Sequence, residues 1–172
     1  ICESLSPDGV VNLLNEYFSL LFDIIDRHGG VVNQFQGDAM LVTFNVPVSN
    51  EDHAAEAIQS AVEIQQILAG HVFCHGEQMV TRIGVNTGNV VAGSVGAHER
   101  LNYTVHGDAV NVAARLEGLN KEFGSRILVS EKSKELAETK LGAALKFSAK
   151  GELPIRGKSE AVKVFEVTYS DA

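Results

Sequence analysis

Residues 29–45 read GGVVNQFQGDAMLVTFN. Two runs with apolar and β-branched residues, 31–36 and 39–45, flank Gly37 and Asp38, and this pattern predicts two strands joined by a tight turn. Such a hairpin pairs antiparallel strands with no helix between them. Adjacent strand segments recur later in the chain, so hairpins outnumber strand–helix–strand units. We therefore predict an α+β fold with a mostly antiparallel sheet and helices packed on one face of it.

Four helices are predicted around these strands. Ser6-Pro7-Asp8 is typical of an N-cap and first turn, and Gly29-Gly30 ends the helix that begins there. A second helix is predicted over residues 50–68. We expect Asp108 to cap a third helix and Ser130 to cap a short fourth helix that frays near residue 139.

The remaining strands are predicted from their apolar, β-branched runs. A polar excursion is expected where the chain passes from Ser94 to Arg100. The chain enters its first helix almost directly from Ile1, whereas a βαββαβ motif begins with a strand. We therefore expect a ferredoxin-like, βαββαβ-type sheet whose first strand is missing from this chain. The other predicted strands are 79–86, 90–93, 101–105, 127–129, 145–147 and 162–168.

Composition limits the function classes. With 172 residues, 45% of them hydrophobic and 21% charged, the chain suits one globular domain and not a disordered segment. No apolar run approaches the ~20 residues of a membrane span, and no signal peptide is expected. The formal net charge of −8 disfavours nucleic-acid binding, so phosphates would need a few placed cations, a metal or backbone amides. Cys2 and Cys74 form no disulfide framework, which favours a reduced, cytoplasmic location.

The hairpin tip carries a candidate metal ligand. A carboxylate at Asp38 would be held rigidly between two strands and still reach solvent, where a hard divalent cation could bind. An ordinary exposed turn is the alternative, and a single carboxylate makes a poor metal site without a partner. Gln34 lies four residues earlier, and strand alternation predicts that its side chain points the same way as that of Asp38.

A second group of polar residues surrounds the third helix. Asn111 and Arg115 are four residues apart, so both side chains lie on one helical face, where an amide and a guanidinium suit a ribose and a phosphate. A solvated face is the alternative, although the flanking apolar residues favour partial enclosure. Thr104 could equally be an ordinary strand residue. The turn Arg156-Gly157-Lys158 could hold a triphosphate or simply be a solvated loop.

Together these motifs resemble one family, the class III nucleotidyl cyclase catalytic domain. The segment 5–18 is similar to its first helix, 29–40 to its metal-binding hairpin, and 82–88 to its next strand and turn. The most specific segment is 103–117, YTVHGDAVNVAARLE. The resemblance follows the chain in order, and it implies one N-terminally truncated cyclase domain over residues 1–172.

The resemblance implies an adenylyl cyclase that converts ATP to 3′,5′-cyclic AMP and pyrophosphate. Its active sites would lie at the interface of a head-to-tail homodimer and would use two Mg²⁺ or Mn²⁺ ions. Asp38 resembles the second metal-binding aspartate, and the first would lie upstream of Ile1. Asn111 resembles the residue that orients the ribose, and Arg115 the transition-state arginine. Sensor or membrane domains could be attached outside this chain.

The resemblance also assigns residues to the base and the phosphates. Gln34 and Thr104 fall at the two base-reading positions, Arg156 at that of a triphosphate-binding lysine, and Arg100 near the phosphates. Adenylyl cyclases usually carry Lys where this chain has Gln34, and guanylyl cyclases carry an acidic residue there. A Gln amide both donates and accepts, so it can pair with either purine.

Alternatives to an adenylyl cyclase therefore remain. One is a guanylyl cyclase or a cyclase of relaxed specificity, and another is a non-catalytic cyclase-homology module that binds nucleotide or dimerises. A diguanylate cyclase is disfavoured because the chain lacks a Gly-Gly-Asp/Glu-Glu-Phe hairpin.

Overall fold

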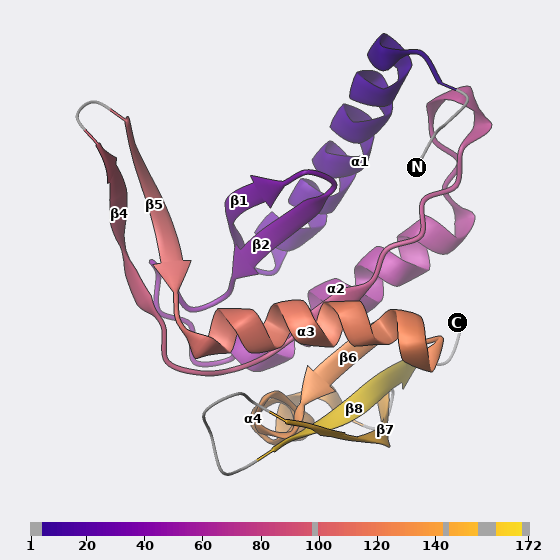
Figure 1. Ribbon diagram of the computed structural model, residues 1–172. Coiled ribbons are helices and arrows are strands. Elements are labelled where there is room, and N and C mark those ends of the chain that lie inside the picture. The colour runs from indigo at the N-terminus through magenta and orange to yellow at the C-terminus, as the bar shows by residue number, and fades with distance from the viewer. Residues whose placement is uncertain (1–4, 98–99, 143–144, 155–160, 170–172) are drawn as a thin grey trace.

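The structure is a computed structural model that describes residues 5–97, 100–142, 145–154 and 161–169. Helices and strands alternate along the chain, with hairpins between helices as predicted (Figure 1). In chain order the elements are α1 (Pro7–Arg27), β1 (Val31–Gln36), β2 (Ala39–Thr43), α2 (His53–Gly70), the 3₁₀ turn η1 (Cys74–Gly76), β3 (Ile83–Val85), β4 (Val91–Ala97), β5 (Arg100–His106), α3 (Asp108–Phe123), β6 (Ile127–Ser130), α4 (Glu131–Leu141), β7 (Leu145–Leu153) and β8 (Val162–Tyr169).

The described strands form three separate sheets. The largest has the strand order β3-β6-β8-β7, in which only the β3–β6 pair is parallel. The hairpins β1–β2 and β4–β5 each form a two-stranded antiparallel sheet. The α+β class and the mostly antiparallel pairing are thus confirmed, although the strands do not join into one sheet.

Helices cover both faces of the four-stranded sheet, so the prediction that they lie on one face is wrong. Every residue of β6 is buried, and successive side chains of a strand point to opposite faces. Ile127 and Val129 pack with α2 and α4, whereas Leu128 packs with α3 on the other side. The reason is that β6 is a central strand, which needs apolar cover on both faces.

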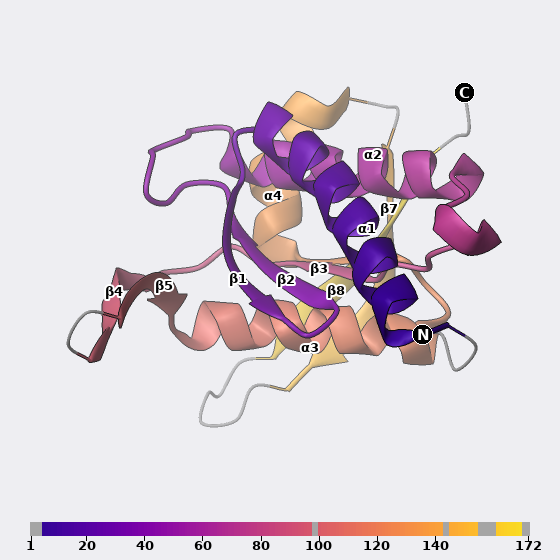
Figure 2. The same ribbon diagram turned by 90° about the horizontal axis from the view of Figure 1, so that it is seen from above.

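Helix α1 and the β1–β2 hairpin share a separate core with α2. The buried side of α1 carries Leu13, Tyr17 and Leu21, which pack with α2 residues and with apolar residues of the hairpin. Ser6 caps the helix as predicted, because its Oγ accepts a hydrogen bond from the backbone N–H of Gly9 at 3.2 Å. Figure 2 shows the hairpin lying beside α1.

Several predicted boundaries need correction. The strand predicted over 79–86 is confined to Ile83–Val85, which are the residues that pair with β6. Within the predicted polar excursion from Ser94 to Arg100, residues 94–97 and Arg100 are instead strand, since β4 and β5 pair from Val91–His106 to Ala97–Arg100. Residues 98–99 lie outside the described part of the chain. The resulting ribbon projects from the body of the molecule (Figure 1).

The start of α3 also differs from the prediction. Asp108 is its first helical residue and not its cap. The N-cap is Gly107, whose φ of 147° lies in a region that side chains rarely adopt. Ser130 does cap α4, because its Oγ accepts from the Ser133 N–H at 3.4 Å. Among the described residues, no helix is long and apolar enough to cross a bilayer.

Candidate active site

Asp38 lies at the exposed tip of the β1–β2 hairpin, as predicted. The last strand pair, Gln36 with Ala39, closes the turn, and Gly37 has a φ of 64°, which glycine adopts without strain. The carboxylate belongs to the turn and not to a strand. Strand alternation therefore ends at Gln36, and it does not set the direction of Asp38 relative to Gln34, contrary to the prediction.

Tyr17 links Asp38 electrostatically to helix α1. Burial raises the pKa of the Tyr17 phenol, the hydrogen bond to Thr81 lowers it, and the negative charge of Asp38 raises it further. The Tyr17 hydroxyl lies 2.7 Å from Oγ1 of Thr81. No sequence pattern marks Tyr17 as a site residue, because its spacing from Leu13 and Leu21 puts it on the apolar stripe of the helix. Only the fold shows that its polar end has a partner.

The donor set around Asp38 does not by itself fit two metal ions. Among the described residues, no group of three or more His, Cys, Asp or Glu side chains could hold a metal. Magnesium prefers octahedral oxygen coordination, usually with one or two carboxylates plus water and substrate phosphates. Asp38 can supply one such carboxylate, so a second must come from elsewhere.

Gln34 has an exposed side chain on β1, where its backbone pairs with Leu41. The register shifts between Val32 and Gln34, so the strand bulges at Asn33. The Asn33 amide holds the bulge by donating to the Val31 carbonyl at 3.1 Å and to Thr43 Oγ1 at 2.8 Å. A bulge re-aims the side chains that follow it. No local sequence pattern predicts this bulge.

Thr104 lies on β5, half-buried and opposite Gly93 of β4. A methyl group built at Gly93 would meet nothing within 4 Å, so the space beside this strand pair is open. Strands β1 and β5 are in contact. The structure therefore places Gln34 and Thr104 on two neighbouring strands that belong to different hairpins.

Asn111 and Arg115 lie on the solvent side of α3. Both are exposed, whereas the adjacent residues Val112 and Leu116 are buried. Nη1 of Arg115 donates to the Pro154 carbonyl at 3.4 Å. The prediction that this face is partly enclosed is not met within the single chain. An exposed guanidinium and amide one helical turn apart can still contact a ligand or a second chain.

Two predicted site residues are described incompletely or not at all. Arg100 is the first residue of β5 and pairs with Ala97, but its side chain lies outside the described part of the structure. Arg156 lies outside the described residues altogether.

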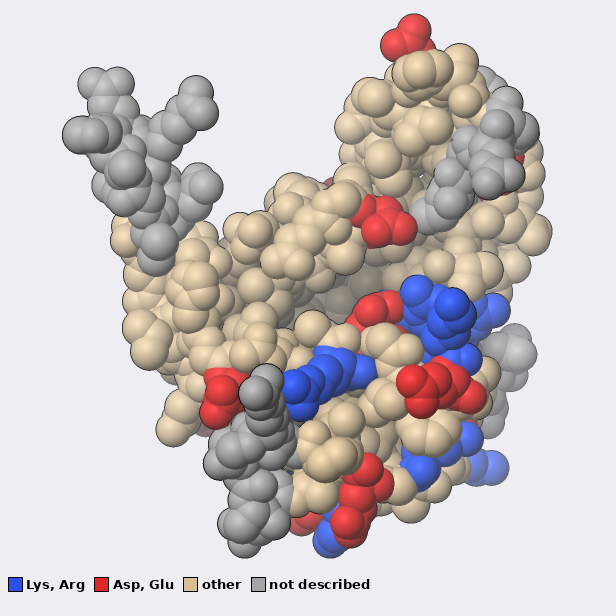
Figure 3. Space-filling view, viewed as in Figure 1, with Lys and Arg blue, Asp and Glu red and all other residues tan. Residues whose placement is uncertain are grey.

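Charged side chains are unevenly distributed over the surface near these residues. On the face shown in Figure 3, charged side chains gather over α3 and the strands below it. The described part of the β4–β5 ribbon is mostly uncharged, and the surface is hollowed between the β1–β2 hairpin and α3 (Figure 3). Charged side chains of both signs gather along the α3 side of this hollow (Figure 3).

Known proteins with related sequences include two adenylate cyclases. Adenylate cyclase 1 of Rhizobium meliloti (strain 1021) is 39% identical over 171 residues, which are 97% of this chain and 25% of that protein. The terminal-differentiation specific adenylate cyclase of Dictyostelium discoideum is 34% identical over 173 residues, covering 96% of this chain and 8% of that protein. The chain therefore spans a quarter or less of these two relatives.

Solved structures give the same result. The guanylyl cyclase Cya2 superposes with a TM-score of 0.80 at 32% identity, over 96% of this chain and 83% of that one. The adenylyl cyclase CyaB from P. aeruginosa has a TM-score of 0.76 at 27% identity, over 98% and 87% of the two chains. Relatives of both specificities are thus similar to this chain.

The family profile covers almost the whole sequence. The profile of the adenylate and guanylate cyclase catalytic domain matches residues 1–168, which include both hairpins and α3. With this match, the chain belongs to the adenylate and guanylate cyclase catalytic domain family.

Proposed function

We propose that this domain is an adenylyl cyclase that converts ATP to 3′,5′-cyclic AMP and pyrophosphate at the interface of a head-to-tail homodimer. The observation that carries the proposal is the exposure of Asn111 and Arg115 on α3, whose opposite face is buried in the core. These side chains are free to contact a ligand held between two chains. The 39% identity to an adenylate cyclase supports ATP as the substrate.

In this proposal the ribose 3′-oxygen attacks the α-phosphorus in line. A new phosphorus–oxygen bond forms, the bond to the bridging oxygen breaks, and pyrophosphate leaves with its electron pair. The proton of the 3′-hydroxyl passes to water. Arg115 supplies a planar array of N–H donors to the charge that develops on the α-phosphate, and Asn111 orients the ribose.

Other residues would hold the ends of the nucleotide. Gln34 and Thr104 contact the base from neighbouring strands, while Arg156 and Arg100 contact the phosphates. Asp38 of the opposite subunit would bind Mg²⁺ or Mn²⁺ together with a carboxylate upstream of Ile1. When bound, the ions neutralise phosphate charge.

The β4–β5 ribbon supports the dimer. Within the described residues it pairs with no third strand, and an isolated two-stranded hairpin is marginally stable in water. Val91 is 75% exposed and Tyr103 42% exposed on this ribbon. A second copy of the chain would cover these apolar side chains. We propose a cytoplasmic location for the domain, to which sensor or membrane domains could be attached outside this chain.

A guanylyl cyclase, or one of relaxed specificity, is the second candidate. Gln34 favours it, because a Gln amide can pair with guanine as well as adenine. The 32% identity to a guanylyl cyclase is in keeping with this alternative.

The test measures cyclic AMP and cyclic GMP formation by the full-length protein over a range of protein concentrations, with Mn²⁺ or Mg²⁺. We expect ATP turnover to exceed GTP turnover and activity per mole to rise with concentration. A monomer whose activity per mole is independent of dilution would contradict the shared site. Nucleotide binding without turnover would identify a non-catalytic module.

A further inference from the structure

Helix α3 carries Asn111 and Arg115, the two side chains proposed to act on the ribose and the α-phosphate. The position of α3 on the sheet therefore determines where these two side chains lie. We propose that Asn120 is a positioning residue: its buried carboxamide fixes α3 against β3 and thereby holds Asn111 and Arg115 in place. This inference rests on the proposed function. Asn120 itself lies on the opposite side of the helix from Asn111, because nine residues make two and a half turns at 3.6 residues per turn.

Asn120 is the polar member of an otherwise apolar stripe. Val112, Leu116 and Asn120 are spaced four residues apart and are 4%, 0% and 1% exposed. Burying an amide is costly unless its hydrogen bonds are made, and Asn is a poor residue inside a helix. Apolar contacts alone are non-directional, so they would let the helix slide or rotate on the sheet.

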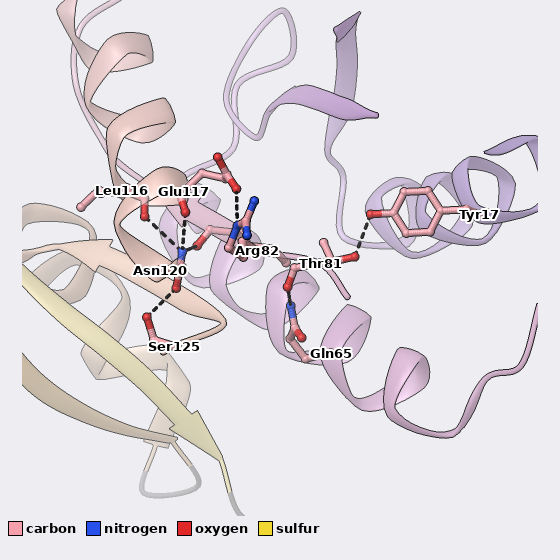
Figure 4. A network of polar contacts seen from close by, with 9 residues as sticks. Tyr17, Gln65, Thr81, Arg82, Leu116, Glu117, Asn120 and Ser125 are labelled. Atoms are coloured by element: carbon pink, nitrogen blue, oxygen red, sulfur yellow. Dashed lines mark hydrogen bonds and ion pairs between the residues drawn. The ribbon is translucent and has the colours of Figure 1, made fainter. Parts of the chain in front are cut away.

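The carboxamide of Asn120 makes the directional contacts that the apolar stripe lacks. Its Nδ2 donates across the interface to the Ile83 carbonyl of β3 at 3.0 Å. Within the helix, Nδ2 also lies 3.1 Å from the Leu116 carbonyl and 3.2 Å from the Glu117 carbonyl. Its Oδ1 accepts from Ser125 Oγ at 2.7 Å (Figure 4). One side chain therefore joins β3, the body of α3 and the segment after it.

Helix α3 approaches β3 as closely as the backbone allows. A methyl group built at Gly84 would lie 2.2 Å from the Ala113 carbonyl oxygen and 2.4 Å from the Glu117 nitrogen. Gly84 thus sets the distance between α3 and β3. Ile83, its neighbour in β3, accepts the hydrogen bond from Asn120, and this bond sets how far α3 can slide along its axis or rotate about it.

The backbone of Asn120 also accepts the hydrogen bonds that cap the C-terminal end of α3. The backbone carbonyl of Asn120 accepts from the N–H of Gly124 and, at 3.0 Å, from that of Ser125. A second link between the segment leading into β3 and the helix, Arg82 Nε to Glu117 Oε1 at 2.9 Å, is exposed at both ends. Exposed ion pairs contribute little to stability, so the buried amide is the stronger constraint.

The positioning role predicts a specific kinetic effect. Asn120→Ala removes the contact to β3 and leaves Asn111 and Arg115 intact, so nucleotide binding survives while alignment is lost. We expect kcat of the full-length enzyme to fall about tenfold or more with KM changed less than about threefold, because misplacement of catalytic groups mainly affects the transition state. Ile58→Val, in the core between α2 and α4, is the control for lost stability.

A second readout does not depend on turnover. Spin labels are placed at exposed Glu122 on α3 and exposed Glu135 on α4, as Glu122→Cys and Glu135→Cys in a chain with Cys2 and Cys74 replaced by serine. The distance distribution between the labels should broaden or shift in Asn120→Ala and stay unchanged in Ile58→Val. Should Asn120→Ala not fold, Asn120→Ser replaces it in both measurements.

The outcomes separate the two proposals. If wild-type protein forms neither cyclic AMP nor cyclic GMP, the proposed function fails, while the label distances still test the positioning of α3. If the distances in folded Asn120→Ala match those of the wild type, or if kcat falls equally in Ile58→Val at a matched loss of thermal stability, the positioning role is overturned.

Discussion

Among the described residues, Arg115 makes one long hydrogen bond, from Nη1 to the Pro154 carbonyl at 3.4 Å, so its guanidinium can turn toward a bound phosphate. Arg115→Ala should lower kcat at least ~100-fold with a smaller change in KM, as expected for the loss of one preorganised transition-state donor. Steady-state kinetics with ATP would measure both constants. Lys121→Ala on the same helix is the control for lost positive charge. A large rise in KM at unchanged kcat would assign Arg115 to ground-state binding.

Gln34 is the residue that we expect to set the choice of nucleotide. A neutral hydrogen bond contributes about 1 kcal/mol, so discrimination by an amide should be about tenfold or less. Gln34→Lys should raise kcat/KM for ATP relative to GTP, because a cation faces the N1–H of guanine unfavourably. Gln36→Lys, on the same exposed strand, is the matched control. If the ratio does not move in Gln34→Lys, this residue does not contact the base.

Tyr17 should make the fold sensitive to alkali. Burial and the charge of Asp38 outweigh the Thr81 hydrogen bond, so the pKa of its phenol is raised above the ordinary value of 10.0. A raised pKa adds stability that is fully present below about pH 10 and is lost as the pH rises further. Tyr17→Phe should therefore lower the free energy of unfolding by about 1 kcal/mol at pH 7 and flatten its decline above pH 10.

Urea titrations at several pH values would measure these free energies. An equally steep alkaline decline in Tyr17→Phe would remove Tyr17 as its cause.

At the scale of elements, the position of the β1–β2 hairpin depends on close packing around Gly30, in the turn between α1 and β1. A methyl group built at Gly30 would lie 2.7 Å from Ile25 Cγ2 and 2.8 Å from the Phe44 ring. Gly30→Ala should therefore destabilise the protein by about 1–3 kcal/mol through overpacking. It should also lower turnover, because the hairpin carries Gln34 and Asp38.

The control for this prediction is Gly70→Ala. A methyl group at Gly70, the last residue of α2, meets nothing within 4 Å, so its stability should not fall. Chemical denaturation compares the two variants. Equal stability of Gly30→Ala and the wild type would show that the hairpin moves freely away from α1.

At the scale of the whole molecule, the shared active site predicts complementation between inactive chains. Asp38→Asn and Arg115→Ala should each abolish or nearly abolish turnover when purified alone, with both chains folded. In a mixed dimer one of the two sites has a complete set of residues. Since half of the dimers are mixed at random pairing, mixing should restore roughly a quarter of wild-type activity.

The measurement is cyclic AMP formation after the two variants are mixed and equilibrated. A mixture of Arg115→Ala with Asn111→Ala is the control, because both substitutions affect the same half of the site and no mixed dimer is complete. Restoration in the control, or none in the test mixture, would contradict the assignment of Asp38 and Arg115 to opposite subunits.

Local sequence signals determined much of this protein. The β1 strand and its turn follow from an apolar run that ends at Gly37-Asp38, and the start of α1 follows from Ser6. The order of motifs, above all 103–117, determined the family. These features depend on periodicity, capping and turn residues, whose physics acts between neighbours in the chain.

Only the tertiary structure decided which faces and edges meet. The short length of β3 and the seven-residue length of β4 and of β5 depend on pairing partners, and the helices lie on both faces because β6 is central. Nothing in the sequence marked Asn120, since an Asn in a helix is ordinarily exposed. Its role depends on contact with Ile83, which is 37 residues away in the chain. Contacts between segments that are distant in the chain depend on the packing of the whole domain. Local sequence patterns therefore do not predict them.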